Sequence, residues 1–193
     1  MPLYREHWWL VHDRRNRRWI GDMQTLLAQV EACTASREAA VLHDEWPGDP
    51  IRVDATVYAS WTGAFSTHRP THVVVASNAR GSQDLYGLEV LIHEVGHGMM
   101  ARIDSALAAE AARQRKQLPG WLSHLVLFHT AGALVREQQP SHTPYAAAFG
   151  IWNQNGRTRD ARAALERVWQ PYLEGRRDFG SAIAALIHWL PGN

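Results

Sequence analysis

The chain has 193 residues, which is enough for one domain with a substantial core and short for two ordinary domains. Twenty basic and nineteen acidic residues leave a formal charge of +1, so the total charge predicts neither a nucleic-acid nor a membrane partner. The single cysteine, Cys33, excludes an internal disulfide and the cysteine-rich zinc modules, so any metal would be held by His, Asp or Glu.

The first residues, MPLYREHWWLVHDRRNRR, lack the apolar core of a signal peptide, and no later segment reaches the ~18 apolar residues of a membrane span. We expect a chain that is cytoplasmic by default, or secreted or periplasmic if a leader has been removed. The basic cluster at residues 13–19 is expected to be a solvated helix face, and the nine tryptophans are expected mostly in the core.

Helix is predicted over roughly the first forty residues. Apolar side chains recur there at three- and four-residue spacing, which lays one stripe along a helix: Met23, Leu26, Leu27, Val30 and Cys33. Pro47 and Pro50 then end the helical pattern.

Strands are predicted next. Apolar and polar residues alternate over residues 51–59, a period of two that is typical of a half-buried strand. WTGAFSTHRP, residues 61–70, carries turn residues, and the β-branched run THVVVAS that follows predicts a second or third strand. Helix returns from about Asp84 and continues to the end.

The predicted fold class is therefore α+β, with N-terminal helices and a small sheet followed by a mostly helical second half. We expect one domain over residues 1–193, with two lobes. The sheet-containing part would cover residues 45–105 and the helical part residues 106–193.

The stretch LEVLIHEVGHGMM, residues 88–100, carries the chemistry. Side chains four residues apart share a face of a helix, so His93 and His97 can supply two nitrogen ligands to one zinc ion at about 2.0–2.1 Å. Glu94 would lie beside the metal as a general base. A shuffled chain of this composition would contain H-E-x-x-H by chance about three times in 100. Because unpartnered polar groups are costly in so apolar a helix, we predict a zinc site.

The HEVGH motif resembles that of the zincin metallopeptidases. The longer metzincin form would have glycine and histidine where this chain has Met100 and Ile103, so the resemblance is to the gluzincin arrangement. It implies a zincin-like fold, Zn²⁺ as cofactor, a third ligand from a later helix, and a sheet whose edge strand binds an extended peptide. LEVLIHEVGH, WLSHLVLFHTAG and HTPYAAAFG together also resemble an uncharacterised group of bacterial metallopeptidases.

A catalytic zinc ion needs three protein ligands and an open position. The gluzincin resemblance implies Glu137 as the third ligand, but helical spacing places Glu137 on the polar face of its helix. His124 falls on the apolar face of that helix beside Phe128, where a polar side chain needs a partner. We therefore favour His124, with the alternatives Glu137, His129 and Glu110.

The sequence also offers residues that could assist the predicted zinc ligands or the substrate. Glu89 and Asp104 could each accept a hydrogen bond from the second ring nitrogen of a ligand, although acids at such positions are more often at the surface. Tyr145 lies where zincins keep a donor for the oxyanion, and a packed aromatic is its alternative role. His142 is the alternative donor.

The expected function is that of a zinc metallopeptidase, in which Glu94 acts as the base and a peptide or protein substrate binds along the edge strand near THVVVAS. The alternatives are a zinc hydrolase acting on small amides or esters, and a metal-binding regulatory domain without turnover. The oligomeric state is left open.

Overall fold

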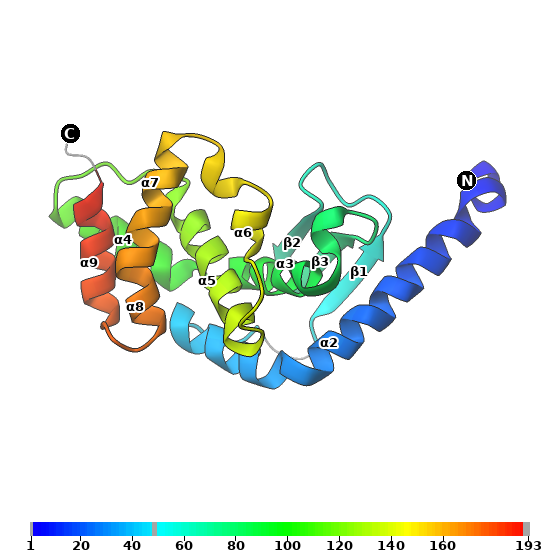
Figure 1. The fold of residues 1–193 in the computed structure, drawn as a ribbon. Coiled ribbons are helices and arrows are strands. Elements are labelled where there is room, and N and C mark those ends of the chain that lie inside the picture. Colours follow the sequence, from blue (N-terminus) through cyan, green and yellow to red (C-terminus); the bar gives the residue numbers. More distant parts are fainter. Residues whose placement is uncertain (1, 48–49, 191–193) are drawn as a thin grey trace.

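The computed structural model describes residues 2–47 and 50–190, which have a mixed α and β fold (Figure 1). One long helical segment opens the chain: α1 (Pro2–Tyr4), the π-helical turn η1 (Arg5–Trp9) and α2 (Leu10–Leu42). Three strands follow: β1 (Arg52–Thr56), β2 (Ala64–His68) and β3 (Thr71–Ala76).

The remainder of the described chain is helical. Its first part contains η2 (Arg80–Ser82), α3 (Asp84–Gly96), η3 (His97–Met99), α4 (Ala101–Arg113) and α5 (Leu122–Gln138). Its last part contains α6 (Tyr145–Ala148), η4 (Ile151–Asn153), α7 (Gly156–Ala164), η5 (Leu165–Trp169), α8 (Gln170–Leu173) and α9 (Phe179–Trp189). This order of elements confirms the predicted α+β class, with helix resuming at Asp84. Among the described residues, no helix combines the length and apolar character needed to cross a membrane.

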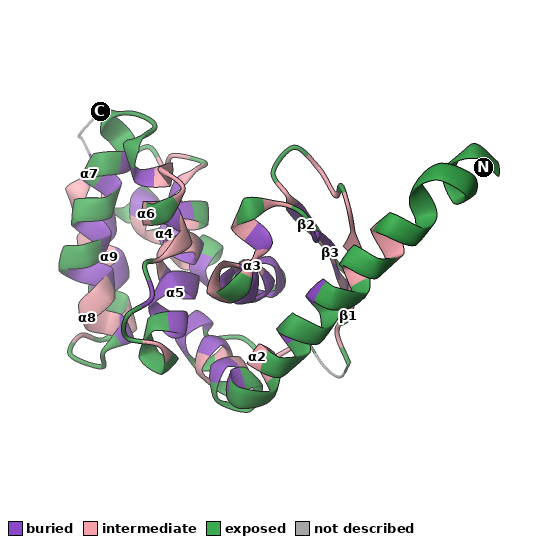
Figure 2. Ribbon diagram, turned by 45° about the vertical axis from the view of Figure 1, so that its right-hand side comes forward, coloured by how far each residue is buried: buried purple, intermediate pink, exposed green. Residues whose placement is uncertain are grey.

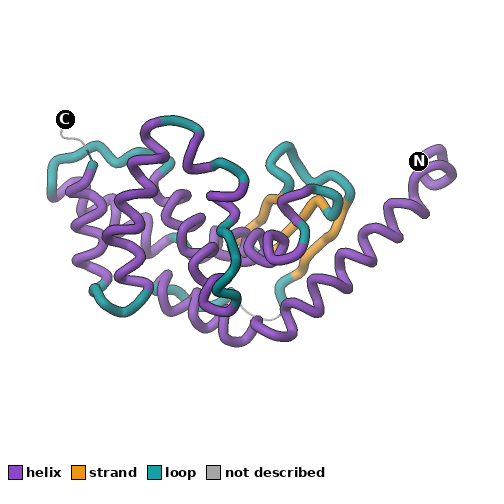
Figure 3. Tube along the Cα trace, in the orientation of Figure 1, coloured by secondary structure: helices purple, strands orange, loops and turns teal. Residues whose placement is uncertain are grey.

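The three strands form one sheet in the order β1-β3-β2 (Figure 3). β1 runs parallel to β3 and β2 runs antiparallel to it, with Ser66 opposite Val73. THVVVAS is therefore the central strand and not an edge strand, and the expectation of a peptide-binding edge at THVVVAS was wrong. β2 is an outer strand that lies inside the segment to which we assigned turn residues. Its alternation is weak because only Ala64 is buried and the next four residues border solvent or a pocket.

The apolar stripe of α2 follows the prediction for its first turns. Met23 and Val30 are buried, but Cys33 is exposed and Thr34 takes the inward position. The stripe advances by four residues after Val30, so it reaches Thr34 and then Glu38. The predicted helical stripe was therefore right up to Val30, and the assignment of Cys33 to it was wrong.

Helix α3 occupies the middle of the molecule, where it packs against α2, α5 and the strands β2 and β3 (Figures 1 and 2). One buried apolar cluster includes Met23 of α2, Val73 of β3, Val95 of α3 and Leu186 of α9. These contacts hold α3 from several sides, so its side chains are fixed relative to both β2 and α5. The division into two lobes stays a prediction.

Glu38 of α2 is fully buried behind α3, and neither of its carboxylate oxygens has a hydrogen-bond partner among the described residues. Its Oε1 lies against Gly96, where a Cβ atom would come within 2.6 Å. Burial raises the pKa of this carboxyl well above its ordinary value. The protonated form is therefore favoured in the folded protein, and ionisation at higher pH destabilises the fold.

Glu38→Met should therefore raise the free energy of unfolding at neutral pH by about 1–3 kcal/mol, because it removes an unpartnered carboxyl and keeps most of its volume. Because the pKa of Glu38 is raised in the folded protein, the fold is most stable below the ordinary pKa of glutamate. Its stability falls as pH rises and the buried carboxyl must ionise. The increase in the free energy of unfolding that Glu38→Met gives should therefore be smaller in mildly acidic buffer, where Glu38 is already protonated. Denaturant titrations at both pH values measure it, with Glu31→Met at an exposed position of α2 as control. A loss of stability at neutral pH would show that Glu38 has a partner in solution.

Candidate metal centre

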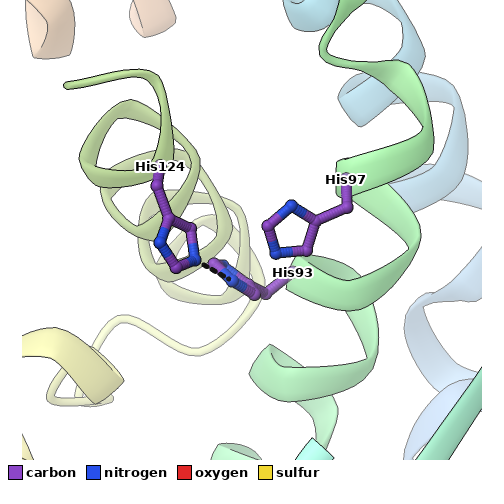
Figure 4. A group of neighbouring side chains, drawn as sticks. All are labelled: His93, His97 and His124. Atoms are coloured by element: carbon purple, nitrogen blue, oxygen red, sulfur yellow. Dashed lines mark hydrogen bonds between the residues drawn. The ribbon is translucent and has the colours of Figure 1, made fainter. Parts of the chain in front are cut away.

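Three histidines meet where α3 and α5 pack together (Figure 4). His93 lies on α3, His124 lies on α5, and His97 begins η3 with helical backbone angles, φ −53° and ψ −35°. The i,i+4 relation between His93 and His97 is thus kept although α3 ends one residue earlier. One nitrogen from each ring lies within 4.8 Å of the others.

The ring nitrogens of His93 and His124 are spaced about as two ligands of one metal ion would be. Nε2 of His93 lies 3.1 Å from Nε2 of His124. Two nitrogens bound to one tetrahedral zinc ion would be separated by about 3.3 Å. The ring of His93 also packs on that of Phe128, with centroids 4.1 Å apart, which holds its orientation. The donor set and its spacing therefore fit a zinc ion.

The protonation states also fit a metal ligand set. Burial lowers the pKa of His93 well below its ordinary value, and the neighbouring His97 and His124 lower it further. Burial, with smaller contributions from His124 and His68, lowers the pKa of His97 to about 4. Partial burial lowers the pKa of His124 as well, although one side of its ring stays open to solvent. All three imidazoles are consequently neutral near pH 7, the form that has a free nitrogen lone pair for a metal.

Glu94 lies on α3 directly after His93 and lines the same pocket. It is buried, and Ser66 of β2 donates a hydrogen bond from Oγ to its Oε2 at 2.9 Å. Burial raises the pKa of the Glu94 carboxyl, and the bond from Ser66 partly opposes this change. The carboxylate is thus oriented by the sheet beside the histidine group.

Two residues of β2 that the sequence reading passed over line this pocket. Ser66 orients Glu94, and the ring of His68 lies 6.3 Å from that of His97 between centroids. Ala64, Ser66 and His68 alternate along the strand, so all three lie on the face toward α3. AFSTH has two apolar residues followed by three polar ones, so its sequence carries no alternation that could have revealed this face.

The pocket has a volume of about 360 Å³ and is bordered by β2, α3, α5 and Tyr145. A second hollow of about 580 Å³ continues from it toward Trp61 and the start of α7. The two hollows share the lining residues Thr62, His124, Phe128 and Tyr145. The histidine group therefore lies in an open groove, reached by solvent at the exposed His124.

Tyr145 begins α6 and borders both hollows. Its ring stacks on Phe149 at 4.4 Å between centroids and lies against Gly81, where a Cβ atom would come within 2.7 Å. Burial and the nearby Glu89 raise the pKa of its hydroxyl, so the group keeps its proton. Tyr145 is thus a packed aromatic that also presents a donor-capable side chain to the groove.

Glu89 supports this tyrosine and not a ligand histidine. Its Oε2 lies 2.6 Å from Nε2 of His142 and accepts a hydrogen bond from the backbone N–H of Tyr145 at 2.8 Å. Both side chains of the Glu89–His142 pair are buried, so the proposal of His142 as a donor to substrate was wrong. Asp104 is an exposed acid on α4, as expected, whereas Glu89 is not at the surface.

The alternative third ligands lie elsewhere and have other partners. Glu137 pairs with Arg37, with Oε2 at 3.3 Å from Nε. Nε2 of His129 lies 2.9 Å from Oε1 of Gln170. Glu110 pairs with Arg113 on the surface of α4. Of the four candidates, the structure brings only His124 to the two histidines of the motif.

A comparison of the chain with models of known protein families, with curated proteins and with solved structures returned no match. The function proposed below therefore rests on the residues of this chain and their geometry.

Proposed function

We propose that the protein is a zinc-dependent peptidase of the zincin type, in which His93, His97 and His124 hold the metal and Glu94 is the general base. The observation that supports it most is one arrangement: three imidazoles converge beside a buried carboxylate in an open groove. A purely structural zinc site has four protein ligands and no use for such a base.

A zinc ion in this position would supply Lewis acidity and lower the pKa of a water molecule. Glu94 is placed to act as the general base toward a water molecule in the pocket and then as the general acid toward the leaving amine. The bond from Ser66 holds the carboxylate in place, and its burial raises its basicity. Tyr145 keeps its proton and so can donate a hydrogen bond to the oxygen on which negative charge develops.

The position of β2 supports a peptide substrate. Within the described part of the chain β2 pairs only with β3, so its other edge offers main-chain N–H and C=O groups beside the pocket. An extended peptide can pair with such an edge and place its side chains alternately up and down. The groove continues past His124, which suits several residues of peptide better than a small amide or ester.

The proposal is tested by incubating the purified protein with a mixed peptide library and reading the products by mass spectrometry. Cleavage should be present with zinc, disappear with a chelator and return when zinc is restored. A panel of small amides and esters is assayed in parallel. If the protein hydrolyses members of that panel but cleaves no peptide, the proposed function becomes that of a small-molecule hydrolase. A zinc-loaded protein that turns over neither would favour a regulatory role.

A further inference from the structure

The described residues have their exposed large apolar side chains concentrated in one place. Of the ten such side chains, six lie between Leu3 and Val11 in α1, η1 and the start of α2. Leu3 and Leu10 are each 71 % exposed, and Trp8 and Trp9 are 59 % and 49 % exposed. We call residues 3–11 the apolar tip.

The apolar tip stands clear of the body of the protein (Figures 1 and 2). Hydrogen bonds join α2 to the body at Asn16, which accepts one from Ser77, and at the buried Trp19, which donates one to the backbone of Ser82. The helix before Asn16 therefore projects by about 20 Å, at 1.5 Å per residue. Nothing else in the described chain covers it.

The tip has a defined local structure. The hydroxyl of Tyr4 lies 3.0 Å from Nδ1 of His12, and the ring of Tyr4 meets that of Trp9 edge-on at 6.3 Å between centroids. The π-helical turn η1 lies between these residues, and such turns often mark functional positions. The aromatic side chains are thus arranged on a preformed helix end.

A basic collar follows the tip, which we define as Arg14, Arg15, Arg17 and Arg18. All four side chains are exposed, and Arg17 pairs with Asp13. Residues 1–20 contain five arginines and two acidic residues, a formal charge of +3 in a chain whose total is +1. The total charge therefore conceals a positive segment, balanced by a negative remainder.

We infer that the tip and collar together bind the surface of an anionic lipid membrane. Tryptophan and leucine at a helix end enter the boundary between headgroups and acyl chains to a depth of about 5–10 Å. The four arginines of the collar lie about 7–14 Å along the helix from Trp9, which places them near the level of the headgroup phosphates. This is attachment at the surface and not a membrane crossing.

Charge and composition disfavour other occupants of the tip. A second copy would bring two segments of the same positive charge together, so the pairing would be opposed by repulsion. Nucleic acid would attract the collar but would leave the apolar tip exposed to water. An anionic membrane can bury the apolar tip and attract the basic collar at the same time.

The test is co-sedimentation of the full chain with vesicles of phosphatidylcholine, with and without phosphatidylserine. Binding should require phosphatidylserine and weaken as salt is raised. Arg14→Gln, Arg15→Gln and Arg18→Gln in one protein should weaken it roughly 100-fold, since each arginine near an anionic surface strengthens binding about fivefold. Trp8→Ser with Trp9→Ser should weaken it by at least about tenfold.

The matched controls carry the same changes elsewhere on the surface. Trp61→Ser, and the triple variant Arg102→Gln, Arg159→Gln and Arg167→Gln, should bind vesicles like the unchanged protein. Circular dichroism checks that every variant is folded. The inference is overturned if the unchanged protein does not sediment with anionic vesicles, or if the tip and collar variants bind as well as it does. It is also overturned if sedimentation equilibrium finds a dimer that the tip variant abolishes, without vesicle binding.

Discussion

Glu94→Gln should lower the rate of peptide cleavage by about 10²- to 10⁴-fold while leaving the metal in place, because general-base catalysis contributes that much. Glutamine keeps the shape of the side chain and can still accept the hydrogen bond from Ser66, but it cannot take a proton at neutral pH. The larger figure is expected if the same carboxylate also protonates the leaving amine.

The measurement compares initial rates on a peptide identified from the library, with zinc content determined on the same samples. Glu137→Gln is the matched control, because Glu137 is an exposed acid paired with Arg37 away from the pocket. Its rate should equal that of the unchanged protein. Equal rates for Glu94→Gln and the unchanged protein would show that Glu94 is not the base.

Replacing any one of the three histidines should strongly weaken zinc binding. His93→Ala, His97→Ala and His124→Ala should each weaken zinc binding by well over 100-fold, since changing even an outer partner of a metal ligand costs about 10- to 100-fold. Glu137→Ala should leave zinc binding unchanged. Competition with a chelating dye measures the affinities, and circular dichroism reports on the fold. A larger loss for Glu137→Ala than for His124→Ala would restore the ordinary gluzincin ligand set.

The histidines of the candidate site could be predicted from the sequence in part because the geometry of His93 and His97 is local. His93 and His97 lie one helical turn apart, so their common face follows from the spacing alone. His124 could be favoured over Glu137 from the polarity of its helix face, although that helix begins 25 residues later in the chain than the second histidine. The structure brings His124 to the pair and leaves Glu137 with Arg37.

The surroundings of the site were less predictable because they depend on distant partners. β2 has no alternation of apolar and polar residues, because residues on both of its faces border solvent or the pocket, so the sequence did not predict it as a strand. Glu89 and His142 are 53 residues apart in the chain, and no spacing rule pairs them. The projecting helix was predicted as a helix, but its exposure follows from packing that a periodic pattern does not encode.

The most direct test of the metal centre is metal analysis of the purified protein together with its zinc absorption-edge spectrum. The expected result is close to one zinc per chain, bound by three imidazole nitrogens and one oxygen from solvent, because three protein ligands and an open position define a catalytic site. Absence of zinc after reconstitution, or a fourth ligand from the protein, would contradict the assignment of this group as a catalytic centre.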